Sequence, residues 1–190
     1  MLSEHYFYNC SKEYVESIDP ELYTEMDDVL CKLPKRNVQA GINSDLFQLL
    51  TENNWAYDSI PQNSASTDLN GRIGKGKSQK DNKRHLCSTS TTLLNASWHS
   101  DFARSYALGL VHLEVQFGKV ESMFKDFCGF RIAYFERRLA LGIEIVMSEP
   151  SKYFAHRKGA VSGMAYFDIA KRTLPAIGLD CPIWLIGIKE

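Results

Sequence analysis

Residues 106–119, with the sequence YALGLVHLEVQFGK, decide what kind of fold this chain adopts. Apolar or small residues recur at every second position, as in a β-strand that buries one face against a core. These positions are Ala107, Gly109, Val111, Leu113, Val115 and Phe117. The opposite face would carry His112, Glu114 and Gln116. The stretch therefore predicts a strand over Tyr106–Phe117 with polar side chains gathered on one face.

The segments on either side of this strand predict an α/β core. Amphipathic periodicity predicts helices upstream, over Pro20–Pro34 and Ser44–Asn53. Downstream, the pattern predicts a helix over Glu121–Leu141, a strand over Ile143–Met147, a helix over Gly163–Thr173 and a strand over Ile183–Ile188. We therefore expect a central mixed β-sheet flanked by helices, in a single domain over residues 1–190.

The charge of the chain is unevenly distributed. Its 190 residues carry a formal net charge of -1 and are enough for one domain and barely enough for two. Residues 1–70 hold 12 acidic and 4 basic side chains, a net -8, whereas residues 71–190 hold 18 basic and 11 acidic ones, a net +7. Because a polyanion responds to the local field rather than to the sum, a nucleic-acid partner stays compatible with this composition.

Other classes of protein are disfavoured by the sequence. No apolar run reaches the 18 or more residues of a membrane span, so we expect no membrane partner. The N-terminus lacks the basic and apolar regions of a signal peptide. The five cysteines are widely scattered without a C-x-x-C pair, which fits buried thiols better than a disulfide framework or a zinc ribbon. We therefore expect a cytoplasmic protein.

A polar stretch, from about residue 59 to 97, predicts a long basic loop. Within it, residues 71–78 read GRIGKGKS and match the G-x-x-x-x-G-K-[ST] phosphate-loop pattern. That motif needs a strand before it and a helix after it, and neither pattern is present here. We therefore expect no nucleotide cofactor. Lys75, Lys77 and Lys80 would instead contact a nucleic-acid backbone, or belong to a solvated loop without function.

Two carboxylates are candidates for a metal site. A hairpin upstream of the predicted strand would bring Asp101 beside Glu114. Paired carboxylates suit Mg²⁺, which keeps several waters and bridges to phosphate. Such a metal lowers the pKa of a bound water and offsets charge on phosphoryl oxygens. From spacing alone, a solvated sheet face with unrelated acids is favoured over a metal site.

The residue identities add a resemblance to a known family. Residues 113–119, LEVQFGK, resemble the active-site strand of the BglII/BstYI-type restriction endonucleases, a branch of the PD-(D/E)xK nuclease superfamily. This branch has Gln where most of the superfamily has Lys. Four further segments are similar to the family: Pro20–Pro34, the Trp-centred Asn54–Asp58, Ser162–Phe167 and the closing Trp184–Ile188.

The resemblance implies roles for three residues. Glu114 would be a metal ligand, Asp101 the first metal-binding acid, and Gln116 the residue at the position of the superfamily lysine. Asp101 precedes Glu114 by 13 residues, more than in the family pattern, and a hairpin turn around Arg104–Gly109 would absorb the difference. Because an amide is not a general base, Gln116 would orient a water rather than take its proton.

Four more residues are weaker candidates. By resemblance, Asp58 would support the metal site and Lys119 and Ser162 would contact DNA bases, since lysine donates to guanine and serine adapts to several bases. His112 lies on the same predicted face as Glu114 and would assist there. The alternatives are a surface aspartate, a solvated lysine, a helix-capping serine and a structural histidine.

The function that this resemblance implies is a Mg²⁺-dependent type II restriction endonuclease. It would hydrolyse phosphodiester bonds at a short palindromic site in double-stranded DNA with an activated water, leaving 5′-phosphates. By resemblance the site has a GATC core and the enzyme is a homodimer, with the Glu121–Leu141 helix as the candidate interface. Two alternatives stay open: a DNA-binding protein of the same fold without catalysis, and a PD-(D/E)xK DNA repair nuclease.

Overall fold

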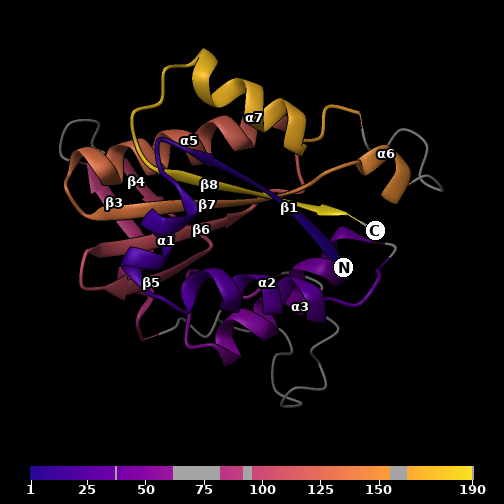
Figure 1. The fold of residues 1–190 in the computed structure, drawn as a ribbon, viewed down its shortest axis with the longest axis horizontal. Coiled ribbons are helices and arrows are strands. Elements are labelled where there is room, and N and C mark those ends of the chain that lie inside the picture. Colours follow the sequence, from indigo (N-terminus) through magenta and orange to yellow (C-terminus); the bar gives the residue numbers. More distant parts are fainter. Residues whose placement is uncertain (37, 62–81, 92–95, 155–161, 190) are drawn as a thin grey trace.

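A six-stranded mixed sheet runs through the centre of the computed structural model, which describes residues 1–36, 38–61, 82–91, 96–154 and 162–189 (Figure 1). The strand order is β1-β8-β7-β6-β5-β2. Strands β6, β7 and β8 are parallel to one another, and the remaining neighbours are antiparallel. The bounds are β1 Leu2–Tyr8, β2 Ala56–Tyr57, β5 Phe102–Tyr106, β6 Gly109–Val115, β7 Leu139–Met147 and β8 Ile183–Lys189.

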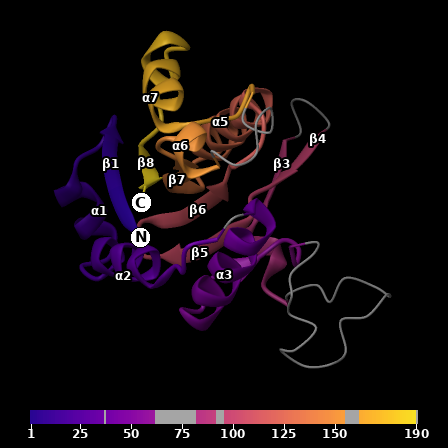
Figure 2. The same cartoon turned by 90° about the vertical axis from the view of Figure 1, so that its right-hand side faces the viewer.

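Helices cover both faces of this sheet, so the predicted α/β architecture is confirmed (Figures 1 and 2). One face carries α1 (Lys12–Ile18), α2 (Leu22–Lys32) and α3 (Gln39–Glu52). The other carries α5 (Val120–Phe135) and α7 (Phe167–Ala176). A short helix α6 (Pro150–Tyr153), a 3₁₀ turn η1 (Arg84–Leu86) and a separate hairpin of β3 (Ser88–Thr91) and β4 (Ala96–His99) complete the described elements.

Side chains of the central strands alternate between two buried layers. Val111 and Leu113 of β6 pack with the apolar residues of α1, α2 and α3. On the other side, Val146 of β7 packs with the apolar face of α5 and α7. His112 and Glu114 are buried on this second side, as the period of two in the sequence predicts. His112 and Glu114 therefore lie between the sheet and the layer of helices that contains α5.

Two predicted boundaries are wrong for identifiable reasons. The predicted Glu121–Leu141 helix ends at Phe135, because Arg137 adopts a positive φ of 57° and the chain then enters β7 at Leu139. The predicted Tyr106–Phe117 strand is divided by a tight turn, since Tyr106 pairs with Gly109 across a hairpin. Strand β1 and helix α1 are additional elements that the sequence did not predict.

The predicted loop over residues 59–97 is wrong for its last part, where η1, β3 and β4 form. This part is ordered because it buries apolar side chains: Cys87 is buried, and Trp98 packs directly on α5. The close approach requires Gly129, since a Cβ there would overlap the Trp98 indole. The phosphate-loop match, Lys75, Lys77 and Lys80 lie outside the described residues. Within the described ranges, no helix has the length and apolar character needed to cross a bilayer.

Candidate active site at the β5–β6 hairpin

The hairpin of β5 and β6 places Asp101 beside Glu114. Phe102 pairs with Leu113, so the residues just before β5 and near the end of β6 are neighbours. The Asp101 N–H donates to Glu114 Oε2 at 3.3 Å, and Asp101 Oδ2 accepts the Val115 N–H at 3.0 Å. The 13 residues from Asp101 to Glu114 are thus accounted for by two paired strands and a tight turn.

Burial dominates the electrostatics of this pair. It raises the pKa of Asp101 above the usual value for an aspartate, although the hydrogen bond from Val115 opposes the shift. Burial also raises the pKa of Glu114 well above its usual value, with further increases from Asp101, Asp126 and Glu144. Glu114 Oε1 is buried without a hydrogen-bond partner among the described residues. A bound cation would offset this concentration of negative charge.

Gln116 is held by hydrogen bonds at both ends of its amide. Its Nε2 donates to Asp126 Oδ2 at 2.8 Å, and its Oε1 accepts the Gly118 N–H at 2.8 Å. Asp126 belongs to α5, so the Gln116 amide connects the end of β6 to the helix that covers this strand. The Gln116 side chain is therefore held in one orientation.

Two buried acids near the pair were not predicted. Asp126 is only 6% exposed, and burial raises its pKa to about 6. Glu144 of β7 pairs in register with Glu114 and is fully buried, and neither of its carboxylate oxygens has a partner among the described residues. Burial raises the pKa of Glu144 well above its usual value. A single acid inside the predicted apolar strand Ile143–Met147 was the signal that would have found Glu144.

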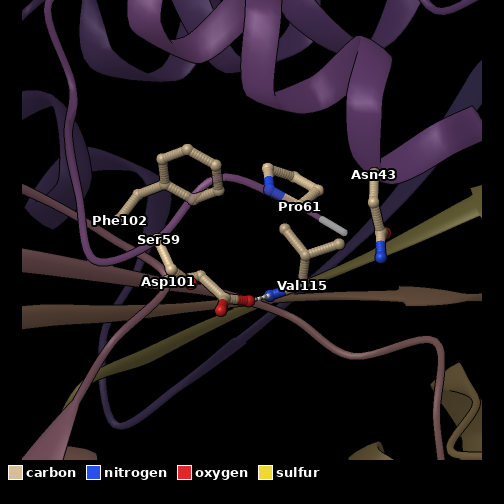
Figure 3. Close-up of a pocket in the computed structure, with 6 residues that line it drawn as sticks. All are labelled: Asn43, Ser59, Pro61, Asp101, Phe102 and Val115. Carbon is tan, nitrogen blue, oxygen red and sulfur yellow. Dashed lines mark hydrogen bonds between the residues drawn. The ribbon is translucent and has the colours of Figure 1, made fainter. Parts of the chain in front are cut away.

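A pocket of about 110 Å³ opens beside Asp101, on the side of the sheet that faces α3 (Figure 3). It is lined by Asn43, Ser59, Pro61, Asp101, Phe102 and Val115. Figure 3 shows Asp101 and Val115 at the level of the sheet and Asn43 reaching from α3. Asn43 Oδ1 is buried without a partner among the described residues. Sequence reasoning did not identify Asn43, since a lone polar residue on an amphipathic helix carries no distinctive signal.

Asp58 lies next to Asp101 and is held by charged neighbours. Its backbone N–H donates to the Asp101 carbonyl oxygen at 3.0 Å. Its Oδ1 accepts from Arg84 Nε at 2.6 Å, and His99 Nδ1 lies 3.1 Å from the same oxygen. The negative charge of Asp58 contributes to the raised pKa of Asp101. Asp58 thus ties η1 and β4 to the candidate metal site.

His112 is buried between β6 and the β3–β4 hairpin. Its Nε2 lies 3.1 Å from the Leu86 carbonyl oxygen, and its ring lies 5.7 Å from the Trp98 ring. Because a carbonyl only accepts, Nε2 carries the proton in this arrangement. Burial lowers the pKa of His112 to about 4, so the ring is neutral at physiological pH.

The structure brings the two candidate DNA-contacting residues close together. Lys119 is exposed and pairs with Met164 in an isolated antiparallel bridge. The Val120 N–H donates to the Gly163 carbonyl at 2.9 Å, and Ser162 is exposed at the same turn. Gly163 adopts a φ of +75°, a conformation that favours glycine and makes this turn possible.

The carboxylate pair fits a divalent metal that prefers oxygen ligands. Asp101 and Glu114 are hard oxygen donors held side by side. Glu114 Oε1 has no hydrogen-bond partner within the described part of the chain, so its lone pairs are available to a metal. No group of three or more His, Cys, Asp and Glu side chains among the described residues is arranged to hold a metal by itself. Mg²⁺ commonly keeps several waters and uses one or two carboxylates with substrate phosphate, so a pair is sufficient.

The chain thus combines a mixed sheet flanked by helices with two adjacent acids at the β5–β6 hairpin, one just before β5 and the other on β6. The crystal structure of restriction endonuclease BglII complexed with a DNA 16-mer has the same fold: the TM-score is 0.63 at 17% sequence identity, covering 100% of this chain and 77% of that chain. Residues 3–188 match the family described as restriction endonuclease BglII/BglIII, and the chain belongs to this family. No curated protein sequence matches the chain.

Proposed function

We propose that this protein is a Mg²⁺-dependent type II restriction endonuclease that acts on double-stranded DNA. Family membership makes it a nuclease of the BglII type, and the metal dependence and the reaction are inferred here. The observation that carries the proposal is the contact between Asp101 and Glu114, with Glu114 Oε1 buried and unpartnered within the described residues. Two acids are brought together at the expense of like-charge repulsion, which a divalent cation would offset.

Asp101 and Glu114 would hold the metal, and Val115 would orient Asp101 through its backbone N–H. Bound there, Mg²⁺ supplies Lewis-acid chemistry: a water of lowered pKa and compensation of charge on the phosphoryl oxygens. Gln116 orients rather than deprotonates, because an amide has no basic nitrogen. Asp58 and His112 support the site by holding η1 and the β3–β4 hairpin beside it. The expected products carry 5′-phosphates.

Exposed polar residues near the site would contact the DNA. Lys119 and Ser162 lie at adjoining turns and would read base edges. Lys75, Lys77 and Lys80 would contact phosphates, as the net +7 of residues 71–190 suggests. The solved complex of BglII with DNA supports double-stranded DNA as the partner. We infer a short palindromic site with a GATC core, cut in the cytoplasm.

Two copies of this chain would bind one palindrome, because two-fold protein symmetry matches two-fold DNA symmetry. The exposed face of α5 is the candidate interface, with Phe124, Tyr134 and Phe135 exposed by 40%, 38% and 61%. Sedimentation of the protein with and without DNA tests this part. A monomer at micromolar concentration under both conditions would contradict it.

The decisive experiment is incubation of the protein with unmethylated plasmid DNA and Mg²⁺, followed by sequencing of the fragment ends. We expect discrete fragments that disappear in Glu114→Ala and persist in Asp28→Ala, which removes an exposed acid of α2. Sequence-specific binding without cutting under any divalent metal would favour the non-catalytic alternative. Smears or structure-dependent nicks would favour a repair nuclease.

A further inference from the structure

The orientation of the Gln116 amide is determined by its two partners. A backbone N–H only donates, so the atom beside Gly118 must be the carbonyl oxygen Oε1. An ionised carboxylate only accepts, so the atom beside Asp126 must be the nitrogen Nε2. A flipped amide would face a donor with a donor and an acceptor with an acceptor. Gln116 therefore has one orientation, with one N–H and one lone pair left for other partners.

Burial and neighbouring acids make an ionised carboxylate at position 126 energetically unfavourable. It is 6% exposed on the inner face of α5, and its charge faces those of Asp101, Glu114 and Glu144. Lys125, the neighbouring cation in the sequence, is exposed. A buried carboxylate without a partner costs more than an apolar residue of similar size. The hydrogen bond that Asp126 accepts from Gln116 offsets part of this cost.

We propose that Asp126 is a positioning residue that fixes the Gln116 amide beside the Asp101–Glu114 pair. The inference rests on the proposed nuclease function and extends it to a residue on α5. Gln116 and Asp126 then form a matched pair, by which we mean that each side chain requires the other. Glutamine stands in place of the superfamily lysine, and Asp126 accepts the hydrogen bond that fixes the amide. A lysine at position 116 would form an ion pair with Asp126 instead of facing the metal site.

The contact can be tested without activity. In ¹⁵N-labelled full-length protein, the Gln116 side-chain NH₂ resonances are assigned by their absence in Gln116→Glu. We expect these resonances to shift strongly in Asp126→Ala and to stay nearly unchanged in Glu121→Ala. Unshifted Gln116 resonances in a folded Asp126→Ala protein would overturn the proposal.

The consequence for catalysis is tested by single-turnover cleavage of a plasmid that the wild-type protein cuts. Asp126→Ala removes the acceptor, so we expect the rate to fall about 10–100-fold while DNA affinity, measured without divalent metal, is unchanged. Asp126→Asn keeps an acceptor oxygen and should retain most of the rate. Equal losses in both variants would mean that the charge of Asp126 matters rather than its hydrogen bond, and would overturn the proposal.

A double-mutant cycle gives a second test. Gln116→Lys alone should cut slowly, because Asp126 pairs with the new ammonium group. Adding Asp126→Asn should raise the rate of Gln116→Lys, although the same change does not raise the rate of the wild-type protein. Additive effects would contradict the matched pair. If the wild-type protein does not cut DNA, the proposed function fails, whereas the resonance test of the contact still stands.

Discussion

At the scale of single residues, four carboxylates near the candidate site influence one another's pKa. Asp101, Glu114, Asp126 and Glu144 each affect the pKa of at least one of the others. Asp101, Glu114 and Asp126 each accept a hydrogen bond, whereas Glu144 has no hydrogen-bond partner within the described residues. Glu144 is therefore the acid whose charge costs the fold most and whose replacement is the most informative.

Glu144→Gln is expected to stabilise the protein increasingly as the pH rises. The pKa of Glu144 is raised in the folded state, so the folded protein binds more protons and loses stability above the unfolded pKa of about 4.5. Between the unfolded pKa and the raised folded pKa, each pH unit lowers the free energy of unfolding by up to about 1.4 kcal/mol, a loss that the glutamine avoids. Urea unfolding without divalent metal at pH 5 to 8 measures the difference. A stability difference that does not depend on pH, or equals that of Glu121→Gln, would contradict this assignment.

The partly buried ion pair of Arg104 and Glu25 offers a second residue-scale prediction. Arg104 Nη1 lies 2.9 Å from both Glu25 oxygens, the side chains are 19% and 18% exposed, and Glu25 Oε1 also accepts from Trp55 Nε1 at 2.8 Å. Arg104→Met leaves Glu25 poorly compensated, so we expect a loss of about 3 kcal/mol. Lys152→Met breaks an exposed pair with Glu149 and should cost at most about 1 kcal/mol. Chemical denaturation compares the two, and equal losses would refute the prediction.

At the scale of elements, the β3–β4 hairpin depends on the closeness of its contact with α5. In Gly129→Ala, the new methyl group meets the Trp98 indole, so the packing must shift. We expect a loss of about 1–3 kcal/mol from overpacking, against a gain of about 1 kcal/mol in helix propensity. Cys128→Ala on the exposed side of the same helix is the control. Thermal unfolding measures both, and a more stable Gly129→Ala would contradict the tight contact.

Elements with a strong local pattern could be predicted from the sequence. The alternation around β6 and the periodicity of α2 gave both elements, and the α/β class followed from their order. Strand β1 could not be predicted, because its residues are half-exposed and lack clear alternation. The end of α5 was missed because Leu139–Leu141 is apolar in either conformation and only pairing with β6 decides between them.

The candidate site was predictable only along the catalytic strand. Asp101 and Glu114 could be paired because a hairpin follows from short-range sequence, and β5–β6 realises it. Asp126 and Glu144 reach the same region through the packing of α5 and through the parallel register of β7, which no local pattern encodes. Long-range packing thus determines the half of the site that sequence reasoning missed.

At the scale of the whole molecule, the basic charge of residues 71–190 predicts salt-dependent DNA binding. Each neutralised phosphate contributes about -0.9 to the slope of log K against log salt. The Lys75→Ala/Lys77→Ala/Lys80→Ala variant should reduce the slope magnitude by about 3 if all three lysines contact phosphates. Fluorescence anisotropy at several salt concentrations measures it, with Lys12→Ala/Lys32→Ala/Lys35→Ala in the acidic portion as the control. An unchanged slope in the first variant would remove these lysines from the interface.

Strand order also constrains how the chain folds. Strand β8 lies between β1 and β7, and Leu2 pairs with Lys189. The sheet therefore receives an interior strand from residues that leave the ribosome long after β1, and β1 stays unpaired until they arrive. Contacts so distant in sequence slow folding and expose strand edges to other chains. We expect nascent chains that end before Ile183 to aggregate or recruit chaperones, so the nuclease would gain its structure only after residues Ile183–Lys189 have been synthesised.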